Sequence, residues 1–424
     1  MKIVHISARD ITGGAARSAH RLHQGLRALG RNSRMFVLHA VGRDPDVVKM
    51  GKSAKLLDRI QRRARREAIL RDFKRYHSTR GRGFEPFQDC RSEFKRDFLR
   101  ELPTADAYNL HWVGDSFLDY ESFFARVSAT SRVVWTLHDM NAFTGGCHYD
   151  LGCGRFSHGC GQCPQLGSRA PEDLSRRIWK LKGEVFSRVE PSRLQFVSPS
   201  RWLADEFRRS PLGERFQVSV IPYGLSMEDF APRDRAACRD ILGLPKEGKV
   251  LLFLADNMDN ERKGFDRMLA ALEALPADLP VTVLSVGRNK PDVRIHVPWV
   301  HAGSVNNDRQ LSVVYSAADI FVIPSSQDNL PNTVLESMAC GTPVLGYAVG
   351  GIQDMVRPGI TGAQVPPEDV EALTAGIVDL LGNPQRLGEM AANCRRVALE
   401  EYPLTLQASR YIRLYDAMTG KYFS

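Results

Sequence analysis

The sequence has no long apolar run. Its longest, VLLFLA at residues 250–255, is far shorter than the ~20 residues that a membrane-spanning helix needs. The opening stretch, MKIVHIS, has one lysine and no extended apolar segment, so it is not typical of a secretory signal peptide. We therefore expect the protein to stay in the cytoplasm.

Other features are also absent, and each absence excludes a class of protein. A hydrophobic content of 43% and a charged content of 25% exclude a disordered or collagen-like chain. No internal repeat or low-complexity tract is found. The glycine stretch ITGGAAR lacks the G-x-G-x-x-G spacing of a dinucleotide-binding dehydrogenase. A soluble globular protein is expected, and its 424 residues are enough for two domains.

Acidic residues are fewer than basic ones, and the net charge is +9. Such an excess suits phosphate-bearing ligands, nucleic acid or an anionic membrane surface. Much of it lies between residues 49 and 100, notably in KLLDRIQRRARREAILRDFKR. There apolar residues at helical spacing are mixed with arginines: Leu56, Ile60, Ala64 and Ala68 against Arg59, Arg62, Arg63, Arg65 and Arg66. Two interpretations stand: this helix lies on anionic lipid headgroups, or its basic face is simply solvated.

Short apolar stretches alternate with helical patterns along the chain. KIVHIS, NSRMFVLH, AYNLHWV, RVVWTLHD and LQFVS are typical of strands, and so are KVLLFLA, PVTVLSVG, DIFVIPS and TPVLGYA. This alternation predicts an α/β fold with two doubly wound parallel sheets, each covered by helices. The stretch SVIPYGLSMEDFAPRDR is the predicted linker, which gives domains at residues 1–222 and 223–404. A final helix at about 405–424 is expected to pack back on the first domain.

Six segments together carry a resemblance to a known family: TGGAARSAHRL, LHDMNAFTGGC, SVIPYGL, ERKGFD, YSAADIFVIPSSQDNLPNTVLESMACGTPVLGYAVGG and the terminal YIRLYDAM. With them the chain resembles the family 4 glycosyltransferases, retaining enzymes of the GT-B type, and among these the transferases of bacterial surface-polysaccharide biosynthesis. The resemblance covers most of the chain. It implies two Rossmann-like domains facing across a cleft, and hexosyltransferase activity on a nucleotide sugar.

The family's carboxylate-x7-Glu signature corresponds to Asp328 and Glu336. A strand precedes it and a helix is predicted from near Thr333, so backbone N–H groups and a helix dipole are available for a sugar diphosphate. Glu336 would accept the ribose hydroxyls and Asp328 those of the donor sugar, although the family has Glu in place of Asp328. The other residues predicted around the diphosphate are Asn329, Leu330, Pro331, Asn332, Thr333 and Val334. Thr333 and Glu336 also form a capping-box pattern, which would explain Glu336 by helix stability alone.

Further donor contacts are predicted next to glycines. Lys263 in ERKGF resembles the family lysine that neutralises the donor diphosphate and stabilises the leaving group. Many relatives add an arginine in a preceding Gly-Arg pair, where this chain has Asn257; Arg262 either substitutes for it or is a surface charge. Gly13 and Gly14 follow the first strand. They would let the backbone approach phosphate, or they form a simple turn.

Histidines stand at the ends of two predicted strands. His138 follows VVWTL, and the resemblance implies that it hydrogen-bonds the donor sugar beside the anomeric carbon, as a neutral or protonated imidazole. The alternative is a strand-end histidine bonded to a backbone group. His111 has a similar position with a less defined role. His20 and His23, on the first predicted helix, are interpreted as packing or surface residues.

The family transfers a sugar with retention, and the leaving phosphate takes the acceptor's proton on the same face. The resemblance therefore implies no catalytic metal, and the DPD triplet at Asp44–Asp46 is interpreted as chance. The predicted acceptor is a hydroxyl of a lipid-linked saccharide, with the enzyme cytoplasmic and peripheral on the inner face of the membrane. Two alternatives stand: a GT-B-type sugar-nucleotide epimerase, and a nucleic-acid-binding protein. The basic residues lack the interleaved aromatics of a single-strand binding surface, so no nucleic acid is expected.

Four of the eight cysteines lie close together in the sequence. Cys147, Cys153, Cys160 and Cys163 form a C-x5-C-x6-C-x2-C pattern among glycines. A cytoplasmic setting disfavours disulfides, so these residues predict a closed structural zinc site, with His148 and His158 as alternative ligands. The other interpretation is a loop of reduced, partly buried thiols.

Overall fold

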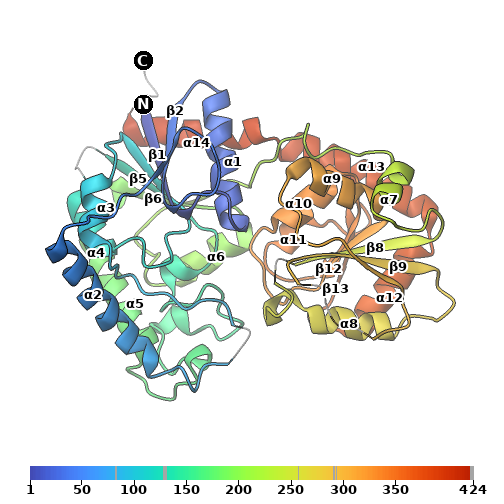
Figure 1. The fold of residues 1–424 in the computed structure, drawn as a ribbon, viewed down its shortest axis with the longest axis horizontal. Helices are drawn as coiled ribbons and strands as arrows, with labels where there is room; N and C mark the ends of the chain where they lie inside the picture. Colours follow the sequence, from blue (N-terminus) through green and yellow to red (C-terminus); the bar gives the residue numbers. More distant parts are fainter. Residues whose placement is uncertain (82–83, 128–130, 256, 290–291, 293, 421–424) are drawn as a thin grey trace. The chain divides into compact units, whose positions relative to one another are not determined.

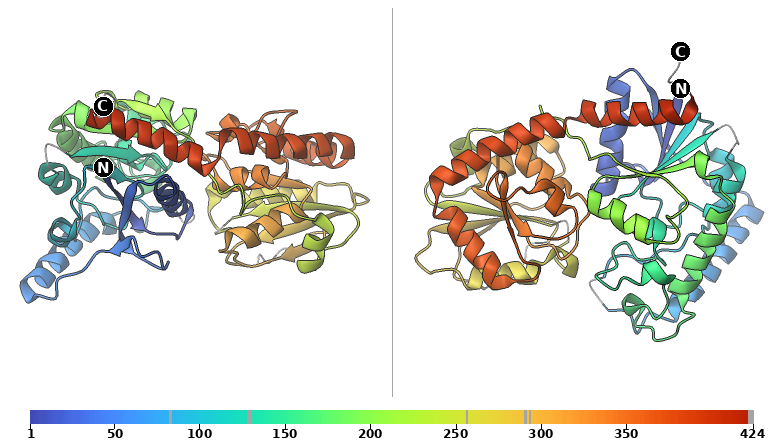
Figure 2. Two further views of the ribbon diagram at one scale, coloured as in Figure 1. Left: turned by 90° about the horizontal axis from the view of Figure 1, so that it is seen from above. Right: turned by 180° about the vertical axis from the view of Figure 1, so that it is seen from behind.

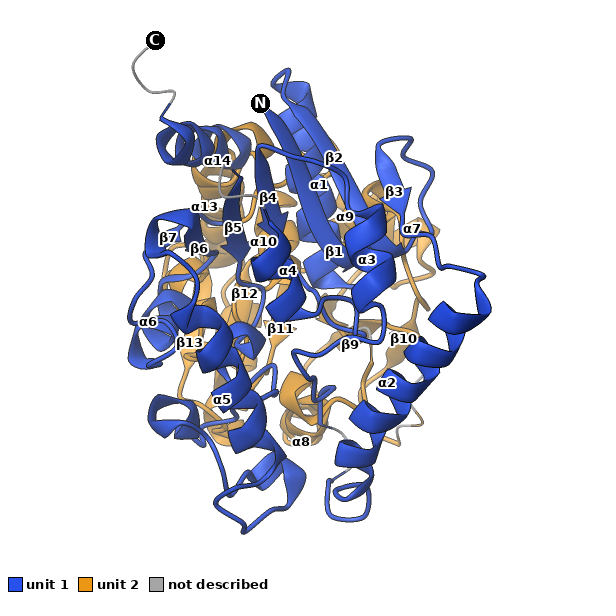
Figure 3. Cartoon of the chain, turned by 90° about the vertical axis from the view of Figure 1, so that its left-hand side faces the viewer, with its two compact units in different colours: residues 1–222, 407–424 blue, residues 223–406 orange. Residues whose placement is uncertain are grey.

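The structure is a computed structural model that describes residues 1–420 except 82–83, 128–130, 256, 290–291 and 293. The chain divides into two compact units, shown in Figure 3. Unit 1 consists of residues 1–222 with 407–424, of which 421–424 lie outside the described residues, and unit 2 of residues 223–406. The predicted last helix is α14 (Leu404–Thr419), so the end of its predicted range lies outside the described residues.

Unit 1 is built on a parallel sheet of seven strands in the order β3-β2-β1-β4-β5-β6-β7. The strands are β1 (Lys2–Arg9), β2 (Asn32–His39), β3 (Val47–Lys49), β4 (Ala107–Leu110), β5 (Arg132–Thr136), β6 (Leu194–Ser198) and β7 (Val218–Val220). The central strands are buried on both faces, which explains their continuous apolar sequences. The strand order reverses between β1 and β4, the place where such sheets bind ligands.

Seven helices of unit 1 are described, and most cover this sheet (Figure 1). They are α1 (Gly14–Ala28), α2 (Leu56–Lys74), α3 (Lys95–Glu101), α4 (Tyr120–Arg126), α5 (Leu174–Ser187), α6 (Arg201–Arg209) and α14. Leu22 and Leu26 of α1 are buried as predicted, whereas Leu29, which follows the end of the helix at Ala28, is 38% exposed. In the described part of the chain, no helix combines the length and apolarity needed to cross a membrane.

The C-terminal helix α14 packs against the sheet of unit 1 (Figure 2). Its Tyr411 and Tyr415 are fully buried beside apolar side chains of the sheet and of α1. The Tyr415 hydroxyl accepts a hydrogen bond from Asn109 Nδ2 at 2.8 Å, and the Tyr411 hydroxyl lies 2.8 Å from Thr136 Oγ1. These polar partners satisfy both buried hydroxyls and fix the helix in place.

Unit 2 repeats the same topology with six parallel strands in the order β10-β9-β8-β11-β12-β13. The strands are β8 (Lys249–Leu254), β9 (Val281–Val286), β10 (Trp299–His301), β11 (Ile320–Ile323), β12 (Val344–Tyr347) and β13 (Gly362–Val365). The helices are α7 (Arg235–Ile241), α8 (Phe265–Glu273), α9 (Asp308–Ala317), α10 (Asn332–Ala339), α11 (Ile352–Met355), α12 (Val370–Leu381) and α13 (Pro384–Glu401). Two doubly wound Rossmann-like sheets were predicted, and the structure confirms both.

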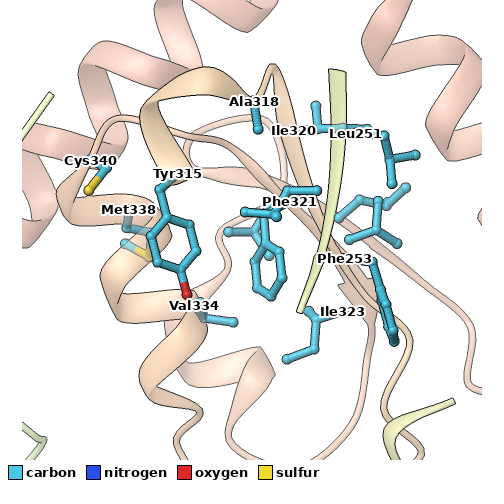
Figure 4. Packing of buried hydrophobic residues seen from close by; sticks show 14 of the residues in the cluster. Leu251, Phe253, Tyr315, Ala318, Ile320, Phe321, Ile323, Val334, Met338 and Cys340 are labelled. Atoms are coloured by element: carbon cyan, nitrogen blue, oxygen red, sulfur yellow. The ribbon is translucent and has the colours of Figure 1, made fainter. Parts of the chain in front are cut away.

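The core of unit 2 holds the sheet against the two helices that frame the candidate site. In Figure 4, Phe321 of β11 lies between the sheet and the ring of Tyr315 on α9. The two rings meet edge to face, with centroids 6.0 Å apart. Val334 and Met338 of α10 are fully buried in the same cluster. This packing fixes the positions of α9 and α10 relative to β11.

One long stretch of unit 1, residues 137–173, contains neither strand nor α-helix. We call it the cysteine loop. It has three short 3₁₀ turns, Asn141–Phe143, Arg155–His158 and Pro164–Leu166. Phe143 packs edge to face on Phe156, and the buried Lys182 of α5 donates to the carbonyl oxygens of Asn141 and Thr144. The loop is therefore an ordered part of unit 1.

Candidate functional site

The predicted donor site lies at the switch point of the sheet in unit 2. The strand order reverses between β8 and β11, and the loops that follow these two strands carry Lys263 and Asp328. Ligands of doubly wound proteins bind at this edge, outside the carboxyl ends of the strands. The topology thus brings together two residues that are 65 positions apart in the sequence.

Asp328 forms a charged cluster with two cations. Its Oδ2 lies 2.7 Å from Lys263 Nζ and 3.2 Å from Arg262 Nη1, and its Oδ1 accepts the Asn329 N–H at 3.1 Å. Burial raises the pKa of this carboxyl, but the charges of Lys263 and Arg262 outweigh burial and hold the pKa at about 2. Asp328 is therefore ionised at neutral pH, although it is buried.

The two cations of this cluster differ in exposure. The Arg262 side chain is 8% exposed, and its Nη1 also donates to the Gln327 carbonyl oxygen at 2.7 Å. Arg262 is thus a buried part of the cluster, and the surface-charge interpretation is wrong. Lys263 is 28% exposed and is the cation that a ligand can reach. Asn257 has a local role, accepting the Asp259 N–H at 3.1 Å.

Two glycines allow the loops around this cluster to pack closely. Gly264 has φ +71°, and a Cβ added there would lie 2.0 Å from the Pro324 carbonyl oxygen. Gly350 has φ +52°, and its Cβ would lie 2.0 Å from the carbonyl oxygen of Asp328. Any other residue would push these loops apart, so the glycine of the Lys-Gly pair is a structural requirement of the site.

Glu336 lies on α10 and is buried. Its Oε2 accepts a hydrogen bond from the Tyr315 hydroxyl at 3.1 Å, a contact that the sequence did not indicate. The helix begins at Asn332 with Pro331 as its N-cap, and no side chain caps it. Thr333 is therefore inside the helix, and the capping-box explanation of Glu336 is wrong. The helical spacing of α9 places Tyr315 on the buried face, and this spacing was the one sign in the sequence that Tyr315 could reach a buried partner.

The residues predicted to present backbone N–H groups are only partly suited to that role. Pro331 has no N–H, and the Val334 N–H donates to the Pro331 carbonyl oxygen at 3.1 Å. The prediction that the amides of these two residues bind phosphate is therefore wrong. Leu330 is buried, whereas Asn332 and Thr333 at the start of α10 are half-buried. The helix N-terminus remains a favourable place for an anion.

Gly13 and Gly14 join β1 to α1 at the switch point of unit 1. Gly13 is the N-cap of α1, with φ +92°, and no side chain caps the helix. Both glycines are exposed, and a Cβ at Gly13 would meet nothing within 4 Å. Gly13 is therefore explained by its backbone conformation, and the N-terminus of a 15-residue helix opens at this edge of the sheet.

His138 belongs to a row of buried imidazoles. Its Nε2 lies 3.0 Å from His111 Nδ1, and His111 Nε2 lies 2.8 Å from Nδ1 of His5 on β1. The backbone-bonded alternative is therefore wrong for Nε2. Burial lowers the pKa of all three imidazoles, to about 4 for His138, so they are neutral at pH 7. Sequence analysis missed His5, because only the order of the strands brings these residues together.

The histidines of α1 lie near this row. His23 is buried, with its Nδ1 2.8 Å from Ser33 Oγ and its ring centroid 6.0 Å from that of His5. His20 Nε2 lies 3.3 Å from Asp44 Oδ2. Asp44 of the DPD triplet therefore has protein partners of its own.

The four predicted zinc ligands are free thiols that line one cavity in the cysteine loop. Burial raises the pKa of each thiol, to about 12 for Cys160 and about 11 for Cys163. Within the described residues, no group of three or more His, Cys, Asp and Glu side chains is arranged to hold a metal ion. The alternative ligands point elsewhere: His148 Nδ1 bonds Asp139 Oδ2 at 2.6 Å, and His158 Nδ1 lies 2.8 Å from Ser157 Oγ.

Residues 248–383 match the family model described as glycosyl transferases group 1. The chain carries a group 1 glycosyltransferase domain. The matched residues lie within unit 2 and include Arg262, Lys263, Asp328 and Glu336. The charged cluster and the buried glutamate are therefore features of the glycosyltransferase domain, whereas His138 and the cysteine loop lie outside the match.

Curated relatives match a stretch of this chain that is longer than the domain. The D-inositol 3-phosphate glycosyltransferase of Thermobispora bispora is 31% identical over 244 residues, covering 52% of this chain and 54% of that protein. The enzyme of the same name from Geodermatophilus obscurus is 31% identical over 257 residues, covering 55% and 53%. The chain spans about half the length of the curated relatives it matches.

Solved glycosyltransferase structures match nearly the whole chain. Sucrose-phosphate synthase from Thermosynechococcus elongatus has a TM-score of 0.67 at 20% identity, covering 99% of this chain and 100% of that one. Anabaena HepE, solved in complex with UDP-glucose, has a TM-score of 0.65 at 13% identity, covering 98% and 100%. These likenesses show the fold, and the predicted GT-B class of two Rossmann-like domains is confirmed.

Proposed function

We propose that the protein is a retaining glycosyltransferase that moves a sugar from a nucleotide-sugar donor to a hydroxyl of a lipid-linked saccharide, in polysaccharide biosynthesis. The observation that carries the transferase part is the cluster of Asp328, Lys263 and Arg262 at the switch point of the group 1 domain, together with the buried Glu336 on α10. A cation and a helix N-terminus favour a diphosphate, and a buried carboxylate favours ribose hydroxyls.

In this proposal each residue of the cluster has a distinct role. Lys263 is held by Asp328 before the donor arrives and turns its charge to the diphosphate when the donor binds. Arg262 remains beside Asp328 and keeps the buried carboxylate neutralised, so that Asp328 can accept a hydroxyl of the sugar. Tyr315 occupies Oε2 of Glu336, which orients the carboxylate toward the ribose.

The reaction exchanges one bond at the anomeric carbon for another. The bond from this carbon to the phosphate oxygen breaks, and a bond to the acceptor oxygen forms on the same face. The acceptor's proton goes to the leaving phosphate, and a nucleoside diphosphate departs. Lys263 stabilises the charge that develops on this leaving group. The resemblance assigns His138 a hydrogen bond to the donor sugar, and its low pKa means that a neutral imidazole makes that bond.

The donor part is tested by thermal shift with UDP, GDP, ADP and dTDP, beginning with UDP because HepE was solved with UDP-glucose. A ligand that binds only the folded chain raises the melting temperature. One nucleotide should stabilise the wild type and Glu273→Gln, an exposed control on α8, but not Glu336→Gln. No shift with any of the four would refute the donor proposal. Donor conversion without acceptor would instead support the epimerase.

The membrane part rests on helix α2, at the edge of unit 1 (Figure 1). Its predicted apolar line faces solvent: Leu56 is 70% exposed, and Leu57 and Ile60 are also exposed. Arg62 and Arg65 turn toward the protein and pair with Asp97 and Asp119, whereas Arg59, Arg63 and Arg66 stay exposed. Exposed apolar side chains among cations are typical of helices that lie on anionic membranes, where a lipid-linked acceptor would be held.

Cosedimentation with liposomes tests this part independently of the donor. We expect vesicles containing anionic lipid to recruit the wild type at low salt, and Leu56→Glu to reduce recruitment severalfold. Ile241→Glu is a matched control, because Ile241 on α7 is also 70% exposed and lies outside α2. If anionic vesicles do not recruit the wild type, or if both variants bind as it does, the membrane proposal is wrong.

A further inference from the structure

The cysteine loop gathers four thiols around one small space. Cys147, Cys153, Cys160 and Cys163 all line a cavity of about 10 Å³, together with side chains such as Phe156. This volume is close to the smallest that holds a single water molecule. The space is therefore of the size of one small ion, and all four cysteines of the loop border it.

A hydrogen-bond donor is directed at one of the four sulfurs, which an apolar packing role does not require. The Gly145 N–H donates to Cys160 Sγ at 3.2 Å. Donors of this kind neutralise part of the charge of a thiolate, which is the form of cysteine that metals bind.

The backbone of the loop is also held in costly conformations. Three residues other than glycine have left-handed φ angles: Leu151 (+51°), Cys160 (+59°) and Gln162 (+48°). Such conformations persist only where the surroundings determine them strongly. A loop of 37 residues without strand or α-helix has few regular backbone hydrogen bonds that could hold such conformations. A metal ion bound by its thiols would supply the missing constraint.

We propose that Cys147, Cys153, Cys160 and Cys163 bind one Zn²⁺ as a closed structural site. The cysteines would bind as thiolates, and their protons would pass to solvent. As the side chains stand, no three potential ligands among the described residues converge on one point. Binding therefore involves rotation about χ1, which moves a sulfur between staggered positions without moving the backbone. The loop, which contains His138 near its start, would be anchored by the ion.

The zinc content of the purified full chain tests this proposal. We expect about one zinc per chain, by mass spectrometry of the metal, after purification without a histidine tag. Cys160→Ser/Cys163→Ser should lose most of it. Cys90→Ser/Cys238→Ser is the matched control, because both cysteines are buried and lie outside the loop, and it should keep the metal. Equal zinc in the two double variants would overturn the proposal.

A second measurement does not depend on the stability of any variant. Wild-type protein stripped of metal and titrated with Co²⁺ should develop the thiolate charge-transfer and visible bands of tetrahedral coordination, and Zn²⁺ should remove them. A metal-free wild type that takes up no Co²⁺, or peptide mapping that shows disulfides within the loop, would overturn the proposal. Nucleotide binding is measured separately, so the zinc proposal can be refuted without refuting the proposed donor site.

Discussion

Replacing Asp328 by asparagine removes a buried charge while keeping the shape of the side chain. The folded chain holds the pKa of Asp328 at about 2, against its ordinary value of 3.8, because Lys263 and Arg262 outweigh the effect of burial. A gap of about two pKa units corresponds to about 2 kcal/mol of stability. Since the folded pKa is lowered, this stability is fully present above about pH 5 and is lost as the pH falls through 4 toward 2. At pH 3 roughly half of it remains.

The assay is urea unfolding of the wild type and Asp328→Asn at several pH values between 3 and 7. The transition measured is the unfolding of unit 2, which contains Asp328. All other titrating groups are common to both proteins, so the difference between their unfolding free energies isolates Asp328. We expect the variant to be less stable by about 2 kcal/mol at pH 7 and by about 1 kcal/mol at pH 3. A stability difference that becomes smaller as the pH falls is the specific signature of the charged cluster.

A control and a contrary result define the test. Asp266→Asn on α8 removes a carboxylate that is 78% exposed, and we expect little change at any pH. A stability difference for Asp328→Asn that stays constant from pH 7 to pH 3 would show that packing, and not the ion pairs with Lys263 and Arg262, accounts for the loss.

Three other predictions concern the rest of the site. Tyr315→Phe should cost about 2 kcal/mol in urea unfolding and weaken nucleotide affinity severalfold by calorimetry, because the Glu336 carboxylate loses a hydrogen bond; unchanged affinity would remove Tyr315 from the site. The unfolding free energy of the wild type should fall as the pH drops from 6.5 toward 4, because these histidines bind protons in the unfolded chain but stay neutral when buried in the folded one. A His111→Phe variant whose unfolding free energy falls equally steeply with pH would contradict this. Gly264→Ala should lower the melting temperature by several degrees, whereas Gly388→Ala, which has open space on α13, should not.

The elements of the fold follow from local patterns that the sequence displays. Apolar strands and helical spacings identified both sheets, and the position of Lys263 and Asp328 after strands of the second half placed them at one edge. The burial of Arg262 was not predictable, because its partners, Gln327 and Asp328, are more than 60 residues away. Helix spacing alone could not tell that the apolar line of α2 faces solvent, since the same pattern usually faces a core.

The histidine row shows a different limit. His5 lies on β1, whereas His111 and His138 follow the ends of β4 and β5, and only the strand order β1-β4-β5 makes the three neighbours. Nothing in the local sequence specifies that order. The prediction for the backbone amides of α10 was wrong for a simpler reason. The helix starts one residue before the predicted Thr333, so the Val334 N–H donates to a carbonyl oxygen at the start of the helix and not to a ligand.

The measurement that tests the central claim most directly is calorimetric titration of a nucleoside diphosphate, and of its nucleoside, into the wild type and Lys263→Met. The account predicts that one diphosphate binds the wild type and that the variant loses at least about tenfold in affinity for it, because the only ligand-accessible cation of the described cluster is gone. Affinity for the nucleoside alone should not change. Equal diphosphate affinity in both proteins, or no binding of any of the four nucleotides, would contradict the proposed donor site.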